Sequence, residues 1–341
     1  MERVPPADRE REGAAARVSV VSEAPEDSSV LVCGRLTGRG SEILRDAGCR
    51  VDHQPRRGGG SLADVISPYH GVIVHTSQIV DAETLAAAPG LRVVGRAGAG
   101  VDNIDLDAAT KAGVLVFNSA GANAVSAAEQ TLGLMLALAR HIPASSAALE
   151  RGVWDRKPYL GVELEGKVLG VIGLGRIGRH VARRAQAFGM RVQAADPYID
   201  SSEAANLDIE MRSLGDLLAG ADWITLHSPL DVSTQHLIDR RALALMKPGA
   251  RLINCARGGL VDEVALLDAL ESGHLAGAAC DVFENEPEPD PALLAHPRFL
   301  GTPHLGGATE EAQRRVDEGI ARQVAACLRE GVVDGAVNRL G

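Results

Sequence analysis

The sequence predicts an α/β protein made of two doubly wound parallel-sheet domains. Short apolar runs with the character of buried strands alternate with helical segments along most of the chain. This is the pattern of parallel strands joined by crossover helices. The alternation forms two series, and one long apolar helix, expected over residues 122–140, separates them. The length of 341 residues also suits two domains.

The first series begins at Val30. Residues 1 to about 28 precede it and are rich in Arg, Glu, Asp, Ala and Pro with little apolar periodicity, which is typical of a disordered leader. Gly113 is a typical end signal for the third helix of the series. We expect strands at 30–33, 71–75, 91–95 and 114–117, and helices at 41–47, 81–88 and 105–112.

The second series begins near Gly166, after the long helix has ended at 141–143 and a polar segment has followed at 153–159. In doubly wound sheets ligands bind beyond the carboxyl ends of the strands, so we expect the ligand cleft between the two halves. The expected strands are 168–172, 190–195, 222–226, 250–254 and 276–280, and the expected helices include 214–219, 262–272 and a closing one at 309–329.

The composition excludes several classes of function. A net charge of −10 argues against a non-specific nucleic-acid binder and against a protein of anionic membrane surfaces. No apolar run is long enough to span a membrane, and the N-terminus lacks the apolar region of a signal peptide. The cysteines lack CxxC spacing and are predicted to be reduced and mostly buried in a cytoplasmic protein. They are Cys33, Cys49, Cys255, Cys280 and Cys327.

A glycine-rich turn follows the apolar run at 168–172. Gly173 allows the tight turn from strand to helix, Gly175 lets the backbone approach a pyrophosphate, and Gly178 lets the helix pack close to the strand. The free N–H groups and the dipole of the helix favour a phosphate there. Asp196 ends the next strand, where its carboxylate would bind ribose hydroxyls and repel a 2′-phosphate. The stretch therefore predicts a site for NAD rather than NADP.

Several long motifs resemble those of the D-isomer-specific 2-hydroxyacid dehydrogenase family, most closely its phosphoglycerate-oxidising members. They are VVGRAGAGVDNIDL, SAAEQTLGLMLALAR, LGVIGLGRIGR, INCARGGLVDE, GAACDVFENEP and PHLGGAT. The resemblance implies a Rossmann NAD-binding domain at 119–304, inserted into a flavodoxin-like substrate-binding domain at 29–118 and 305–341. Because the chain stops just after Asn338, the resemblance also implies a short form without the C-terminal regulatory domain of many such enzymes.

Hydride transfer from a 2-hydroxyacid requires a cation for the substrate carboxylate and carbonyl, and a proton donor and acceptor. Arg257 can supply the cation, because a guanidinium forms two hydrogen bonds to a carboxylate. The resemblance assigns the acid–base role to His304, and an imidazole exchanges protons near neutral pH. A carboxylate facing this histidine would favour the imidazolium and fix its tautomer. The sequence alone leaves Glu284, Glu286 and Glu288 as candidates, and the resemblance selects Glu286.

The same resemblance implies further contacts with NAD. Asp281 is the implied acceptor for the nicotinamide carboxamide, although an aspartate at a strand end can equally cap a turn. His227, His236 and His274 have no metal-ligand partners at a useful spacing, so we expect no metal. The other implied NAD contacts are Arg176, Ile177, Ser228, Cys255, Ala256, Gly306 and Gly307.

A phosphorylated substrate requires basic groups around its far end. Arg96 is one candidate, with Ala97 and Gly98 beside it in the loop. Arg156 and Lys157 are others, and the family's arrangement implies that they reach across a dimer interface. The alternative for these two residues is an ordinary solvated loop.

Two departures from the phosphoglycerate-oxidising pattern concern the substrate pocket. His75-Thr76 stands where those proteins carry Arg-Ser or Arg-Thr, and a neutral imidazole is a poorer phosphate anchor than a guanidinium. The usual Asn-Thr-Pro-x-Gly-Asn is replaced by a segment that ends at Asn123 and has no proline. We expect this change to reshape the loop beside the substrate carboxylate.

The favoured function is therefore NAD-dependent oxidation of a D-2-hydroxyacid by a homodimer or dimer of dimers, with no nucleic-acid or membrane partner. The favoured substrate is 3-phospho-D-glycerate, oxidised to 3-phosphohydroxypyruvate in serine biosynthesis. The alternative enzyme acts on glyoxylate, hydroxypyruvate or a phosphonate analogue, and His75 is its main support. A rival from another class is an NAD-sensing protein like the family's transcriptional corepressors, which can keep the same catalytic side chains.

Overall fold

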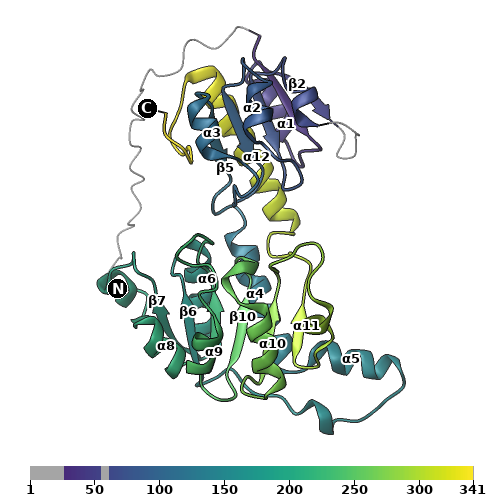
Figure 1. Ribbon diagram of the computed structural model, residues 1–341, viewed down its shortest axis with the longest axis vertical. Coiled ribbons are helices and arrows are strands. Elements are labelled where there is room, and N and C mark those ends of the chain that lie inside the picture. The colour runs from purple at the N-terminus through teal and green to yellow at the C-terminus, as the bar shows by residue number, and fades with distance from the viewer. Residues whose placement is uncertain (1–26, 55–60, 341) are drawn as a thin grey trace, which may run out of the picture. The chain divides into compact units, whose positions relative to one another are not determined.

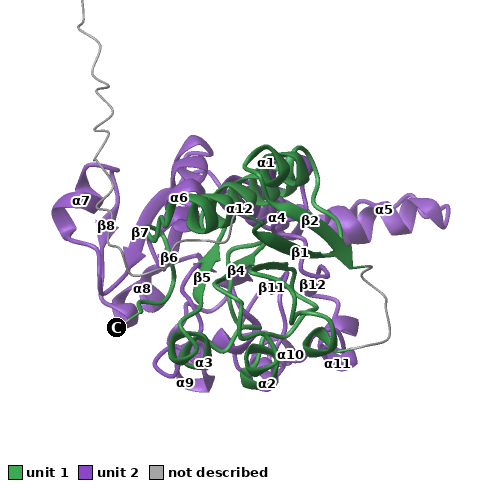
Figure 2. Ribbon diagram, turned by 90° about the horizontal axis from the view of Figure 1, so that it is seen from above, with its two compact units in different colours: residues 1–122, 313–341 green, residues 123–312 purple. Residues whose placement is uncertain are grey.

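A computed structural model describes residues 27–54 and 61–340 of the chain (Figure 1). Two compact units divide it: unit 1 comprises residues 1–122 and 313–341, and unit 2 comprises residues 123–312 (Figure 2). Each contains one sheet of parallel strands with helices on both faces, which confirms the predicted fold class. The predicted disordered leader lies almost wholly outside the described residues.

Unit 1 has a five-stranded sheet in the order β2-β1-β3-β4-β5. Both faces are covered, so successive residues of one strand enter different cores. Val30 and Val32 pack with the layer that includes α12, whereas Leu31 and Cys33 pack with the layer that includes η1, α2 and α3. The strands are β1 Ser29–Cys33, β2 Arg50–Gln54, β3 Gly71–Val74, β4 Val93–Arg96 and β5 Leu115–Asn118. The helices are α1 Gly40–Asp46, η1 Leu62–Asp64, α2 Ala82–Ala86, α3 Leu106–Lys111 and α12 Glu310–Glu330.

Unit 2 has a seven-stranded sheet in the order β12-β11-β10-β9-β6-β7-β8. Its strands are β6 Val168–Ile172, β7 Arg191–Ala195, β8 Glu210–Met211, β9 Trp223–Leu226, β10 Arg251–Asn254, β11 Gly277–Cys280 and β12 Phe299–Gly301. Its longer helices are α4 Ala124–Ala139, α5 Ile142–Glu150, α6 Arg176–Ala187 and α10 Glu263–Glu271. The shorter ones are η2 Lys157–Tyr159, α7 Ser201–Ala205, α8 Leu214–Gly220, α9 Arg240–Leu245, η3 Gly258–Leu260 and α11 Pro291–Ala295.

The unit boundaries fall at 122/123 and 312/313 rather than at the predicted 118/119 and 304/305. Hydrogen bonds explain the difference. Ser119 Oγ donates to the carbonyl of Val316, and Arg315 Nε donates to the carbonyl of Ala122, which ties residues 119–122 to α12. At the other boundary, Thr309 is hydrogen-bonded to Ser126 of α4 (Oγ1 to Oγ, 2.8 Å), so the segment after residue 304 stays with unit 2.

The helix predicted over 122–140 is α4, and its apolar residues, including Leu132, Leu134 and Met135, pack into one core of unit 2. No single helix in the described part of the chain is long and apolar enough to cross a membrane. Among the helices of the described residues, α4 and α5 meet that criterion when taken together, as a pair bent by 61°. The five cysteines are buried free thiols.

Candidate active site

The glycine turn joins β6 to α6 in unit 2. Gly173 has a φ of +91°, and a Cβ there would lie 2.7 Å from the carbonyl carbon of His227, so only glycine fits this turn. Gly178 packs against the same turn, because its Cβ would lie 2.1 Å from the Gly173 carbonyl oxygen. Ser228 follows His227 and faces the turn through its backbone nitrogen, 2.8 Å from where a Gly173 Cβ would be.

The structure fits a pyrophosphate at this turn. A Cβ at Gly175 would meet no protein atom within 4 Å, so the space over the start of α6 is open. The helix begins at Arg176 without a side-chain cap, and its first N–H groups, including those of Arg176 and Ile177, have no acceptor within the helix. Beside the turn, the Asp196 carboxylate accepts hydrogen bonds from the N–H groups of Leu174 and Tyr198 (2.8 and 2.9 Å).

Arg257 follows β10 in a loop that Asn254 fixes. Asn254 is buried, its Oδ1 accepts from Ala256 N (3.0 Å), and its Nδ2 donates to the carbonyl of Arg257 (2.8 Å). Arg257 is extended and its Nη1 donates to the carbonyl of Ala256 (2.7 Å). Cys255 and Ala256, which precede Arg257, are buried. Sequence reasoning did not select Asn254, although a polar residue at the end of a buried strand was a signal for it.

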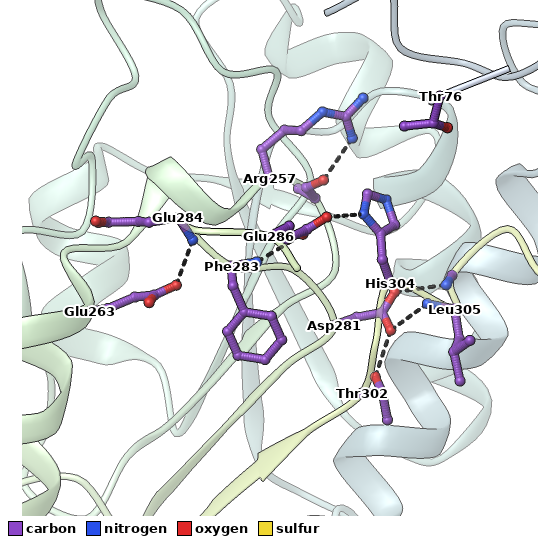
Figure 3. Close-up of polar contacts among 12 residues, drawn as sticks. Thr76, Arg257, Glu263, Asp281, Phe283, Glu284, Glu286, Thr302, His304 and Leu305 are labelled. Atoms are coloured by element: carbon purple, nitrogen blue, oxygen red, sulfur yellow. Dashed lines mark hydrogen bonds and ion pairs between the residues drawn. The ribbon is translucent and has the colours of Figure 1, made fainter. Parts of the chain in front are cut away.

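His304 and Glu286 form a hydrogen-bonded pair (Figure 3). His304 Nδ1 lies 2.9 Å from Glu286 Oε2, and the two side chains are 48% and 37% exposed. The other carboxylate oxygen, Oε1, accepts from Phe283 N (3.0 Å). A carboxylate on Nδ1 fixes the tautomer of the ring and leaves Nε2 for a substrate. Of the three glutamates that sequence left open, Glu284 instead contacts His236 (2.8 Å) and Glu288 offers its carbonyl to Asn285.

Asp281 holds the loop that carries His304. Its carboxylate, 1% exposed, accepts from the N–H groups of Leu305 and Gly306 (2.8 and 2.7 Å) and from the hydroxyl of Thr302 (Figure 3). His304 itself has a φ of +54°, which is unusual for a residue with a side chain. The three hydrogen bonds give Asp281 the turn-capping role that was the alternative reading, and its contact with nicotinamide stays a prediction.

Asn123 and Gly307 lie together in unit 2, since a Cβ on Gly307 would be 3.0 Å from Asn123 Nδ2. Arg156 and Lys157 are exposed, and Lys157 N donates to Asp155 Oδ1 (3.0 Å) within the same loop. Their substrate roles therefore stay predictions.

The other residues predicted to bind substrate, His75, Thr76, Arg96, Ala97 and Gly98, lie at the carboxyl edge of the unit 1 sheet. Arg96 donates from Nη2 to the hydroxyl of Thr76 (2.9 Å) and from Nη1 to the carbonyl of Ala97 (2.8 Å). Gly98, with a φ of +153°, leaves room for this guanidinium, because its Cβ would lie 1.5 Å from Arg96 Nη1. Thr76 and Arg96 line an open pocket of about 490 Å³. His75 precedes Thr76 after β3.

Arg35, which the sequence analysis did not select, is exposed in the loop after β1. Val32 of β1 is paired with Ile73 of β3, so continuing that register places the loop that starts at Gly34 beside the loop that starts at His75. In this strand order the edge between β1 and β3 is the usual ligand-binding position.

The sequence model of the protein family described as "D-isomer specific 2-hydroxyacid dehydrogenase, NAD binding domain" matches residues 132–306. This chain belongs to that dehydrogenase family. The matched region contains the glycine turn, Asp196, Arg257, Glu286 and His304, so the family's NAD-binding domain accounts for the open turn before α6.

Among curated relatives of this chain, D-3-phosphoglycerate dehydrogenase of Rattus norvegicus is 45% identical over 309 residues, covering 91% of this chain and 58% of the relative. The enzyme of that name from Mycobacterium bovis is 50% identical over 267 residues, covering 78% and 51%. The chain thus spans little more than half the length of these relatives.

Solved structures agree with the fold of this chain. A glyoxylate reductase from Paecilomyes thermophila superposes with a TM-score of 0.84 at 32% identity, covering 91% of this chain and 98% of that one. D-lactate dehydrogenase from Aquifex aeolicus, complexed with NAD and lactic acid, gives a TM-score of 0.79 at 27% identity, covering 92% and 100%. Within the described residues no three His, Cys, Asp or Glu side chains are grouped as a metal site would require.

Proposed function

We propose that the protein is an NAD-dependent oxidoreductase that interconverts a D-2-hydroxyacid and its 2-oxoacid, with 3-phospho-D-glycerate and 3-phosphohydroxypyruvate as the favoured pair. One observation carries the reaction type: His304 Nδ1 is held by Glu286 at 2.9 Å, which leaves Nε2 for a substrate hydroxyl. The identity of 45% and 50% to D-3-phosphoglycerate dehydrogenases supports the choice of substrate.

Each catalytic side chain has a distinct task in this proposal. Arg257 binds the substrate carboxylate and polarises the C2 oxygen with its fixed positive charge. His304 Nε2 accepts the hydroxyl proton during oxidation and returns it during reduction. Glu286 stabilises the imidazolium that forms and keeps the ring in one tautomer. The turn at Gly173–Gly178 and Asp196 would hold NAD, which would supply the acceptor for the C2 hydride.

The phosphate of the substrate requires cations from outside this cluster. We propose Arg96, whose guanidinium is already oriented by Thr76 and Ala97, together with Arg35. These two arginines would replace the guanidinium that phosphoglycerate-oxidising relatives carry at the position of His75. Arg156 and Lys157 of a second copy are further candidates, since both are exposed.

A second candidate is a reductase for an unphosphorylated acid such as glyoxylate or hydroxypyruvate. The imidazole at position 75 favours it, and so does the similarity to a structure named as a glyoxylate reductase. An NAD-sensing binding protein that keeps the same three side chains is less favoured. Pull-down of partners with and without NADH would separate it from an enzyme.

We further propose that the protein acts as a homodimer in serine biosynthesis and in the cytoplasm. Exposed apolar side chains on the segment 142–160 support self-association. Five cysteines kept as free thiols suit a reducing compartment.

The deciding experiment is NADH oxidation with 3-phosphohydroxypyruvate, hydroxypyruvate, glyoxylate and 2-oxoglutarate at equal concentrations. A kcat/KM for the phosphorylated acid at least about tenfold above the others, equivalent to about 1.4 kcal/mol in the transition state, would support the proposal. Equal or better rates with an unphosphorylated acid would favour the second candidate. No turnover of any 2-oxoacid would contradict both.

A further inference from the structure

The peptide bond between Phe283 and Glu284 is held on more than one side. A Cβ on Gly258 would lie 1.9 Å from the Phe283 carbonyl carbon and 2.4 Å from Glu284 N, so the residue after Arg257 packs directly on this peptide. The N–H of Phe283 itself, which belongs to the preceding peptide, donates to Glu286 Oε1 (3.0 Å). Phe283 therefore links the Arg257 loop to the carboxylate that holds His304.

Glu263 fixes the same peptide from α10 (Figure 3). Its Oε1 accepts the N–H of Glu284 at 2.8 Å. Glu263 is the first residue of α10, and the side chain of Asp262 caps the helix by accepting from Ala265 N. Because Asp262 caps the start of α10, the Glu263 carboxylate is available to bind the N–H of Glu284 in the neighbouring loop.

Placing the Glu263 carboxylate at this position has an electrostatic cost. Burial raises the pKa of Glu263, the N–H of Glu284 opposes the rise, and the nearby carboxylates of Glu284, Asp290 and Glu286 add to it. A carboxylate kept half-buried among like charges needs its hydrogen-bond donor. The Glu284 side chain is itself turned away to His236, whose backbone N–H binds the carbonyl of Gly259 (2.7 Å).

We infer that Glu263 is a positioning residue for the proposed reaction: by binding the N–H of Glu284 it holds the 283–284 peptide so that Glu286 stays on His304 Nδ1 in register with Arg257. Glu263 acts through the loop and touches none of the reacting atoms. The inference rests on the proposed function for its kinetic consequence, whereas the restraint on the loop can be measured without turnover.

A matched pair of substitutions isolates the hydrogen bond. Glu263→Gln keeps the length and an acceptor oxygen, whereas Glu263→Met keeps the length and apolar contacts but has no such oxygen. Glu271→Met, at the exposed end of the same helix, controls for the loss of a charge. Glu263→Ala takes the place of Glu263→Met if that variant does not fold.

We expect Glu263→Met to lower kcat at least tenfold with KM changed less than threefold, while NADH affinity stays that of the unsubstituted protein. Glu263→Gln should stay within about threefold of it, and Glu271→Met should be indistinguishable from it. In a Glu286→Gln background the further substitution Glu263→Met should cost nothing more, because its effect passes through Glu286. A full tenfold loss in that background, or a Gln variant as poor as the Met variant, would overturn the inference.

Amide hydrogen exchange gives the readout that needs no activity. Glu263→Met should speed exchange at Glu284 by at least tenfold, and Glu263→Gln should not. Unchanged exchange in the Met variant would refute the positioning contact even if kcat fell. If the unsubstituted protein turned over no 2-oxoacid, the proposed function would fail while the exchange result still decided the contact.

Discussion

At the scale of single residues, the reaction depends on which nitrogen of His304 remains available. Glu286 occupies Nδ1, so replacing the imidazole with an amide removes the proton acceptor at Nε2 without removing any predicted NAD contact at 173–178. We expect His304→Gln to lower kcat by about 10²–10⁴-fold, the usual contribution of a general acid–base group. NADH affinity, measured by fluorescence titration, should change less than twofold. Retention of a tenth of the turnover would remove His304 from the mechanism.

Gly258 is a second residue whose size decides activity. An alanine methyl would overlap the Phe283 carbonyl, 1.9 Å from its carbon and 2.0 Å from its oxygen, and the 283–284 peptide would have to move. Since a displacement near 1 Å can cost about 10²-fold in rate, we expect Gly258→Ala to lower kcat by about that factor.

Gly133 provides the matched control for Gly258. It lies inside α4, and a Cβ there would meet no atom within 4 Å. Gly133→Ala should stabilise the protein by about 0.5–1 kcal/mol, because alanine loses less backbone entropy in a helix. Urea unfolding and steady-state kinetics check both variants. Normal turnover in Gly258→Ala would show that the 283–284 peptide can move without loss of activity, which would contradict this prediction.

At the scale of elements, the sequence predicted what depends on local pattern. The unit β6–turn–α6–β7 followed from glycines at fixed spacing and a terminal aspartate. Polar or short elements were not predicted: β2, whose residues Arg50–Gln54 lie at a sheet edge and are half-exposed, carries no apolar signal. The start of α5 was read only as the end of α4, although a proline in the first turn of a helix is well tolerated.

The end of β9 makes stability depend on pH. The His227 ring is partly buried, with Nε2 3.0 Å from Thr225 Oγ1, and burial lowers its pKa from 6.5 to about 3. Between these values the unfolded chain binds a proton that the folded protein does not, so stability is complete above pH 6.5 and is lost as the pH falls. From pH 7 to pH 5 this residue should remove about 2 kcal/mol from the free energy of unfolding.

Comparing variants isolates that contribution. His227→Gln should lose about 2 kcal/mol less than the unsubstituted protein over the same pH interval, in urea titrations at pH 7 and pH 5. His53→Gln, at an exposed position, should behave as the unsubstituted protein does. An equal pH dependence in the His227 variant would show that this histidine is protonated in the folded state.

At the scale of the whole molecule, the β/α alternation predicted two domains and the family resemblance implied that one is inserted into the other, but neither gave the unit boundaries. The segments 119–122 and 305–312 are assigned by contacts such as Ser119 with Val316 and Ser126 with Thr309, which join positions about two hundred residues apart. No local pattern encodes those pairs. The same limit explains why Glu263 was missed: its role depends on the N–H of Glu284, which only the tertiary fold brings near.

Self-association is the prediction that concerns the intact molecule. The segment 142–160, which includes α5, extends from the rest of unit 2 (Figure 2). It exposes large apolar side chains: Ile142 is 52% exposed, Leu149 55%, Val153 49%, Trp154 83% and Leu160 87%. So much apolar surface within one short segment is typical of a protein interface. We therefore expect a homodimer that buries this segment, and serine at both Trp154 and Leu160 should produce monomers at micromolar concentration in sedimentation velocity.

Exposure alone does not distinguish an interface from scattered surface residues, so the control must be equally exposed and lie elsewhere. Tyr198 and Val232 are 92% and 99% exposed and lie outside the segment. Serine at these two positions should leave the dimer intact. If Arg156 and Lys157 serve the active site of the second copy, the monomeric variant should also show a raised KM for 3-phosphohydroxypyruvate and an unchanged KM for hydroxypyruvate, because only the phosphorylated acid needs those cations. A dimer that survives both interface substitutions would place the contact on another surface.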